Sequence, residues 1–485
     1  MSHQADHVVS ASNPDAGQPT RVSRVKLAIC ALFVAFPPII FYSLLTARGL
    51  DIPYLDDYDG VLGFLNRMVQ LDPFGAKVSY LIARQDSEFK LVLMHGVAWI
   101  QFALGGHVDF RLLGAIGNVT ILLLAIVLWK LFLPGQKDAA QRLAWFIPVP
   151  WLLFQLQYWD ALNWATPGLQ HLPVLPFALG AVYFLLQPKR ASFWLALACL
   201  ALAASSDGNG LIMIPIGMLI LALRRRYARL AGWVAVSAGC IAMYAYHYHA
   251  ILSEASGHGT AIMLSSTAAH RSLFSVILRM RPLYVVSFMG NAAGFAFLFK
   301  TSSIILGILL CLFFASLVFR GYYRRNPAVF YSLLFLLVTS IGVAGLRSDF
   351  GLEQSLLPRY TIYSVLFVIL AWFAIVEEFV QPRRRPLLND GIFLSAVAAA
   401  ILFSLFMDFA GAHAIDVRNQ VLVEAMLRFE HPTPQDPAPS PSIPVIGPWP
   451  LVTSSPFNPH AREVLLESMK LGIYSPPDLQ RVEPH

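Results

Sequence analysis

The sequence contains few charged residues. Asp, Glu, Lys and Arg make up 13% of the 485 residues, about half the share that is typical of soluble domains. Hydrophobic residues make up 57%, and the mean hydropathy is +0.60. This composition excludes an ordinary soluble domain and predicts a polytopic membrane protein.

Cysteine is also scarce. The chain has four, and each lies inside an apolar segment with no metal-ligand spacing: Cys30, Cys199, Cys240 and Cys311. They are therefore interpreted as small buried hydrophobic residues. Four histidines near residues 247–270 match no zinc motif either, and they are interpreted as interfacial or core residues.

The formal charge of +7 comes from short clusters of Lys and Arg between apolar runs. That pattern is typical of cytoplasmic loops and does not indicate nucleic-acid binding. The clusters lie near residues 21–26, 130–142, 189–190, 224–229, 320–325 and 383–385. With the N-terminus inside, every second loop is basic, so the C-terminus is expected outside.

Long apolar runs dominate the rest, and a helix needs about 20 apolar residues to cross the hydrocarbon core. Eleven crossings are predicted: 26–46, 110–133, 141–158, 168–187, 191–205, 211–223, 229–248, 302–320, 328–346, 360–380 and 391–409. Two further stretches, 89–104 and 283–298, could be crossings, re-entrant segments or interfacial helices. The expected fold is therefore an all-α membrane protein with about 11–13 transmembrane helices.

Three regions follow from this pattern. Residues 1–24 form a polar leader, interpreted as disordered and cytoplasmic, and residues 25–409 form the transmembrane domain. Within that domain, 48–109 is the first external loop and 249–300 a large external loop. Residues 410–485 form a small external tail, Pro-rich over 431–459 and ending in a short amphipathic helix.

The first external loop is unusually acidic. The stretch DIPYLDDYDG, residues 51–60, carries four carboxylates just after the first apolar run. A solvated loop end that helps to fix topology would explain them. However, Tyr54 and Tyr58 alternate with the acids, Pro53 fixes the backbone before them, and an amphipathic stretch that could lie in the membrane interface follows. Asp56 and Asp57 are therefore candidates for chemistry.

At this point the chain resembles the GT-C superfamily of polytopic glycosyltransferases, and within it a bacterial branch. That branch carries F-x-D-E-W in the first external loop, followed by N-E-H-R, W-G-x-Q, F-A-N-G and S-R-Y elements. The similar segments here occur in the same order: YLDDYD, SEFK (87–90), NWATPGLQ (163–170), SSDGNG (205–210) and PRYTIYS (358–364).

The resemblance implies transfer of a sugar from a polyprenyl-phosphate-linked donor to a glycan, lipid-linked or protein acceptor. Such transfer needs a base for the acceptor hydroxyl, and positive charge or a metal at the departing phosphate. Asp56 or Asp57 is the expected base. The same pair could instead hold a divalent cation, Mg²⁺ or Mn²⁺. The expected substrate-binding residues are Glu88, Lys90, Trp164, Gln170, Asp207, Asn209, Arg279, Arg281, Arg347, Arg359 and Tyr360.

The chain is accordingly expected to be a glycosyltransferase of the bacterial inner membrane, with membrane lipids and no nucleic acid among its partners. Two other classes remain open. A transporter or flippase of lipid-linked sugars would need ionisable residues in the middle of its helices. A non-catalytic cell-envelope assembly protein would tolerate the loss of Asp56 and Asp57.

Overall fold

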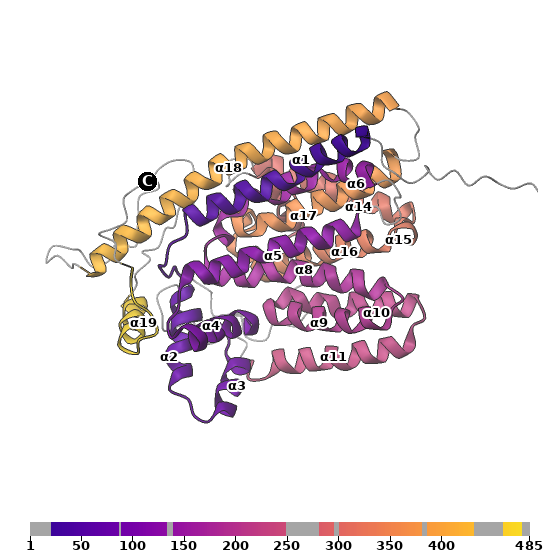
Figure 1. The fold of residues 1–485 in the computed structure, drawn as a ribbon. Helices are drawn as coiled ribbons and strands as arrows, with labels where there is room; N and C mark the ends of the chain where they lie inside the picture. The colour runs from indigo at the N-terminus through magenta and orange to yellow at the C-terminus, as the bar shows by residue number, and fades with distance from the viewer. Residues whose placement is uncertain are drawn as a thin grey trace, which may run out of the picture.

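The structure is a computed structural model, and it describes residues 21–86, 89–132, 139–248, 281–294, 300–380, 386–430 and 459–477. In these parts of the chain every regular element is a helix, apart from one isolated β-bridge between Asp86 and Phe89. The long helices lie side by side in a bundle (Figure 1). The expectation of an all-α polytopic membrane protein is thus confirmed at the level of the fold class.

Among the described residues, eight helices are long and apolar enough to cross a membrane. They are α1 (Arg21–Ala47), α5 (Phe110–Leu131), α8 (Ala165–Leu186), α11 (Tyr227–Ala245), α14 (Lys300–Phe319), α16 (Pro327–Arg347), α17 (Pro358–Ile375) and α18 (Pro386–Glu430). Most residues of α8 and α17 are buried, whereas few residues of α1, α11 and α18 are. The buried pair forms the centre of the bundle, and the other three cover its outside, where apolar side chains suit lipid.

The other three expected crossings are shorter or broken. Residues 141–158 form α6 (Ala139–Phe146), α7 (Pro148–Leu153) and the 3₁₀ helix η2 (Leu156–Ala161). Pro148 and Pro150 interrupt the run because proline has no backbone N–H to donate. The remaining two are α9 (Arg190–Ser206) and α10 (Met213–Leu223), which the 3₁₀ helix η3 (Gly208–Ile212) joins.

The two ambiguous stretches are short helices. The first contains α4 (Val92–Gly105), and the second contains α13 (Pro282–Met289) and η4 (Asn291–Ala293). Short helical elements lie between the long helices: α15 (Tyr322–Arg325), η6 (Ser348–Phe350), η7 (Leu352–Leu356) and the π-helix η8 (Val376–Val380).

The expected boundary between transmembrane domain and tail, at residue 409, falls inside α18. This helix continues to Glu430, and its later residues Leu422 and Met426 are buried against the first external loop. The drop in hydropathy after residue 409 therefore marks a change in what the helix contacts, and the helix itself does not end there.

The first external loop folds into the π-helix η1 (Tyr58–Gly63), α2 (Phe64–Val69), α3 (Phe74–Ala83) and α4, at one end of the bundle (Figure 1). The tail helix α19 (Pro459–Lys470) packs on η1 and α2. The side-chain amide of Asn66 donates to the carbonyl of Val464 at 3.1 Å and accepts from the Ser468 hydroxyl at 2.8 Å. Loop and tail therefore share one apolar core.

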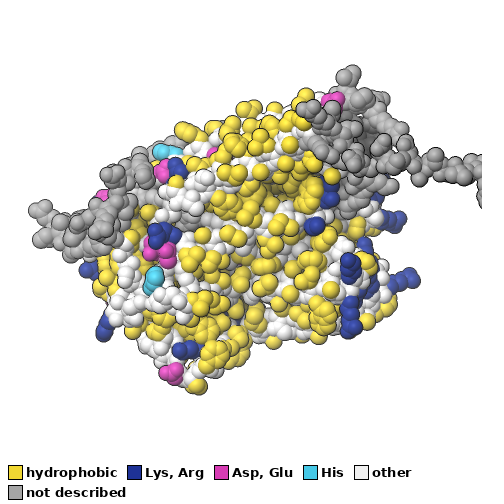
Figure 2. All heavy atoms as spheres, in the orientation of Figure 1, with side chains coloured by type: hydrophobic (Ala, Val, Ile, Leu, Met, Phe, Trp, Pro, Cys, Tyr) yellow, Lys and Arg dark blue, Asp and Glu magenta, His cyan; other side chains and the backbone are white. Residues whose placement is uncertain are grey.

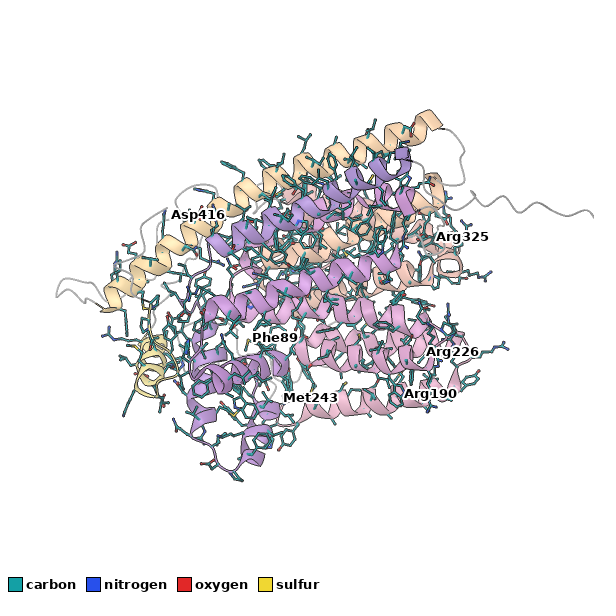
Figure 3. All side chains as sticks on the ribbon, viewed as in Figure 1. Phe89, Arg190, Arg226, Met243, Arg325 and Asp416 are labelled. Carbon is teal, nitrogen blue, oxygen red and sulfur yellow. The ribbon has the colours of Figure 1, made fainter. Side chains whose placement is uncertain are left out.

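Charge divides the two ends of the bundle. Lys and Arg side chains gather at the end opposite the first loop (Figure 2), where Arg190, Arg226 and Arg325 lie. Phe89 and Asp416 lie toward the other end (Figure 3). These three described members of the basic clusters thus lie at one end, as residues of cytoplasmic loops would.

Candidate functional site

Asp57 is buried, with 1% of its surface exposed, and its carboxylate is fully hydrogen-bonded. One oxygen accepts from the backbone N–H of Thr166 at 2.9 Å and from its hydroxyl at 2.7 Å. The other accepts from the backbone N–H of Tyr54 at 3.1 Å. Since Trp164, the capping residue of α8, makes no side-chain cap, Asp57 supplies the acceptor at this helix N-terminus.

Close packing between two glycines, Gly117 and Gly168, fixes the position of the N-terminus of α8. A Cβ on Gly117 of α5 would lie 2.9 Å from the carbonyl carbon of Gly168 in the first turn of α8. Only glycine lets the two backbones approach this closely. The crossing therefore positions Thr166, and through it the acidic turn of the first loop.

Asp56 differs from its neighbour. Its side chain is open to solvent, yet surrounding protein is dense enough that burial raises the pKa of its carboxyl. The nearby charges act in both directions: Arg359 and Arg347 lower that pKa, while Asp86 and Asp160 raise it. Asp56 is therefore an accessible carboxylate with two arginines in its electrostatic surroundings.

Arg359 lies at the start of α17, with Nη1 3.6 Å from Oδ2 of Asp160. Its guanidinium lies 5.8 Å from the ring centres of both Trp164 and Tyr360. Aromatic faces and one carboxylate thus orient the guanidinium, and the remaining N–H groups could bind an anion.

Arg347, the last residue of α16, lines a cavity of about 340 Å³. Its guanidinium lies 5.4 Å from the ring of Phe89 and 5.5 Å from that of Phe350. The cavity is also lined by Asp207, Asn209 and Tyr360. Four of the residues expected from the sequence to bind substrate therefore come together in one place.

Asp207 connects α9 and η3 and is buried. Its Oδ1 accepts from the side-chain amide of Gln170 at 3.2 Å and from the N–H of Gly208 at 2.7 Å. Its Oδ2 lies 3.2 Å from Nδ1 of His171. Gln170 therefore supports the cavity indirectly, by holding Asp207.

The remaining expected residues lie elsewhere or outside the description. Lys90 is fully buried and donates to the carbonyls of Ile82, at 3.0 Å, and Tyr246, so it joins α3 to the end of α11. Arg281 is exposed at the start of α13 and does not line the cavity. Glu88 and Arg279 lie outside the described residues.

Asp86 belongs to a separate buried cluster next to this site. It pairs with His95 at 2.7 Å and with Arg84 at 2.9 Å, and His95 stacks on Phe64 with ring centres 4.4 Å apart. Burial would raise the pKa of Asp86, but His95 and Arg84 outweigh it and lower the pKa to about 2. Asp86 is thus an anion that holds the loop together.

Asp56 and Asp57 do not fit a shared divalent cation. Both oxygens of Asp57 already accept hydrogen bonds, so the pair offers one free carboxylate. Among the described residues no group of three or more His, Cys, Asp or Glu is placed to hold a metal ion. We therefore derive no step through a metal.

The sequence interpretation missed three residues of the site. Asp160 pairs with Arg359, His171 pairs with Asp207, and the buried Arg418 of α18 lies 6.0 Å from the ring of Trp159 and donates to the carbonyl of Leu162 at 3.2 Å. Asp160 lies shortly before the NWATPGLQ segment (163–170), and His171 follows it directly. The sequence gives only a weak indication of a role for Arg418, because it is a single basic residue that follows the apolar run 391–409.

Comparison with known proteins adds little to this picture. No family model matches the chain, and no solved structure matches it. An uncharacterized protein of Archaeoglobus fulgidus is 26% identical over 168 residues, which cover 29% of this chain and 79% of that protein. The class that the fold defines is therefore a helical, multi-pass membrane protein, and its described residues form a polar cavity.

Proposed function

We propose that this protein is a membrane glycosyltransferase of the GT-C type, which transfers a sugar from a polyprenyl-phosphate donor to an acceptor hydroxyl. One observation carries the proposal. The accessible carboxylate of Asp56 lies in the electrostatic surroundings of Arg359 and Arg347, and Arg347 lines a cavity with Asp207, Asn209 and Tyr360. A base, two phosphate-binding groups and a polar pocket are the parts that the reaction requires.

In the proposed reaction, Asp56 accepts the proton of the acceptor hydroxyl. The acceptor oxygen then forms a bond to the anomeric carbon of the sugar, and the bond from that carbon to the phosphate oxygen breaks. The electron pair leaves with the phosphate, whose charge Arg359 and Arg347 stabilise through bidentate hydrogen bonds. Direct displacement of this kind inverts the anomeric configuration.

Asp56 is preferred over Asp57 as the base because of their hydrogen bonds. Asp57 accepts three from Thr166 and Tyr54, so a further proton transfer would have to break the capping of α8. Burial raises the pKa of both carboxyls, which suits general-base catalysis, so the hydrogen bonds and not the pKa distinguish the two residues. Asp57 is then a positioning residue, and Asp56 the catalytic one.

The site would open on the non-cytoplasmic face of the inner membrane. Arg190, Arg226 and Arg325 lie at one end of the bundle (Figure 3), and α19 and the loop that carries Asp56 lie at the other (Figure 1). A topology reporter fused after Glu430 should therefore be external, and one fused after Arg226 cytoplasmic.

The central test compares Asp56→Asn with Asp57→Asn in membranes that contain equal amounts of each variant. The measurement is release of polyprenyl phosphate from a radiolabelled sugar donor. Asp56→Asn should lower it by about a hundredfold or more. Asp59→Asn, which removes an exposed carboxylate of the same turn, should leave it unchanged.

Normal transfer by Asp56→Asn would disprove the assignment of the base. A transporter would give a different result. The labelled donor would cross the bilayer with its glycosidic bond intact, both in the wild type and in Asp56→Asn.

A further inference from the structure

The cavity beside Asp56 has two unlike walls. One wall is polar and carries His171, Asp207, Asn209 and Arg347. The other is apolar and comes from η3 and α16: Leu211, Ile212, Gly342, Val343 and Leu346. At about 340 Å³ the cavity is at the small end of ligand pockets, which span about 300–1,000 Å³. It suits one small polar group that is attached to an apolar chain.

Two polar atoms in this lining have no hydrogen-bond partner in the described part of the chain. They are Oδ1 of Asn209, whose side-chain nitrogen donates to the Tyr363 hydroxyl at 2.9 Å, and Oγ1 of Thr339. Both atoms are buried. Since a buried polar atom without a partner costs about 1–3 kcal/mol, such atoms in a cavity indicate a ligand that completes them.

His171 adds a third group, and its orientation is fixed. Its Nδ1 donates to Asp207, which Gln170 and Gly208 hold in turn. The rings of Tyr360 and Tyr363 contact the imidazole edge to face, with centres 5.7 and 6.3 Å away. This arrangement selects one tautomer and leaves Nε2 as the nitrogen available to a ligand.

We propose that this cavity is a pocket for the sugar of the lipid-linked substrate, and that His171 is a specificity-determining residue whose Nε2 accepts a hydrogen bond from a sugar hydroxyl. Thr339 and Asn209 supply two further hydrogen bonds. The lipid chain leaves along the apolar wall that η3 and α16 form. This inference rests on the proposed function only in taking the substrate to be a lipid-linked sugar.

A sugar fits this lining better than a bare phosphate does. Two acceptor atoms, Nε2 of His171 and Oδ1 of Asn209, suit hydroxyl donors. The tyrosines beside them offer apolar ring faces to the C–H surface of a pyranose. Arg347, which also lines the cavity, and Arg359, which does not, suit the phosphate. The two halves of the substrate are thus recognised by different residues.

The test measures binding and needs no turnover. Purified protein in nanodiscs is titrated with polyprenyl phosphate alone and with a panel of the same lipid that carries a single hexose, N-acetylhexosamine or pentose. The wild type should bind at least one sugar-bearing lipid about tenfold or more tightly than the sugar-free lipid, since each good hydrogen bond contributes about 1.4 kcal/mol at this level.

His171→Gln and Thr339→Val should each remove most of this preference and leave the affinity for the sugar-free lipid unchanged. Thr339→Val is the cleaner variant, because the hydroxyl has no partner to lose within the described residues and valine keeps its volume. His107→Gln, an exposed histidine outside the cavity, is the matched control and should behave as the wild type.

Equal preference for the sugar in wild type, His171→Gln and Thr339→Val would overturn the assignment. So would a wild type that binds every lipid of the panel no better than the sugar-free one. Either result is distinct from failure of the proposed function, which is decided by whether Asp56→Asn stops sugar transfer.

Discussion

The carboxylate of Asp57 accepts hydrogen bonds from both the backbone N–H and the hydroxyl of Thr166, at 2.9 and 2.7 Å. The two residues are 109 positions apart in the chain. This contact caps α8 from the loop that follows α1, and it fixes the backbone beside Asp56. Asp57 therefore has a structural role, and Asp56 is the carboxylate that we propose for the chemistry.

Asp57→Ala is expected to destabilise the protein by about 3 kcal/mol, because three buried donors lose their acceptor and each orphan costs about 1–3 kcal/mol. Asp57→Asn should cost less, since its carbonyl can still accept from Thr166. Thermal unfolding in one detergent measures both. Asp59→Asn is the control, and a wild-type melting temperature for Asp57→Ala would contradict the capping role.

The pH dependence of stability should also report Asp57. Burial, which outweighs the bonds from Thr166 and Tyr54, raises its pKa from 3.8 to about 7. The folded protein therefore binds more protons than the unfolded chain between these values, so this residue's contribution is complete below pH 3.8 and is lost as the pH rises through about 7. Asp57→Asn should flatten that part of the stability profile, measured by unfolding between pH 5 and 8.

Asp86 should act in the opposite direction. With its pKa lowered to about 2 by His95 and Arg84, its contribution is present above the unfolded value of 3.8 and is lost as the pH falls through about 2. Asp86→Asn should cost about 3 kcal/mol at neutral pH because Arg84 and His95 then lack their anion in a buried setting. Chemical unfolding at pH 7 tests this, and a cost below about 0.5 kcal/mol would show that the cluster is dispensable.

Arg359→Lys should weaken binding of polyprenyl phosphate by about tenfold or more. A lysine keeps the charge but loses the planar fork that Asp160, Trp164 and Tyr360 orient. Lipid titration in nanodiscs measures the loss. Arg281→Lys, at an exposed position away from the cavity, should change affinity by less than about twofold. Equal effects of the two variants would mean that Arg359 does not contact the phosphate.

The contact between tail and loop should be measurable as a coupling energy. Asn66→Ala and Ser468→Ala remove the two sides of one buried hydrogen bond of 2.8 Å. Each should cost about 1–3 kcal/mol, and the double variant should cost about 1 kcal/mol less than their sum. The exposed pair Gln70 and Glu467, 3.1 Å apart, is the control and should show little coupling. Strict additivity at Asn66 and Ser468 would contradict the docking of α19.

The sequence by itself determined the class of fold. Scarce charge and long apolar runs require helices that bury their own backbone hydrogen bonds, and this requirement holds whatever the helices contact. Asp207, Asn209 and Arg347 fall between the expected crossings, and the resemblance to the GT-C superfamily named them, with Tyr360, as substrate-binding residues. It found these residues one by one and did not group them.

Only the tertiary structure decided which polar groups are free. Asp56 and Asp57 are adjacent and identical in the sequence, yet Thr166, more than a hundred residues later, occupies one of them. His171 has no motif of its own and gains its orientation from Asp207, 36 residues away. Lys90 looked available and is bonded to two carbonyls. A residue's partners depend on how distant helices pack, and local pattern carries no information about that.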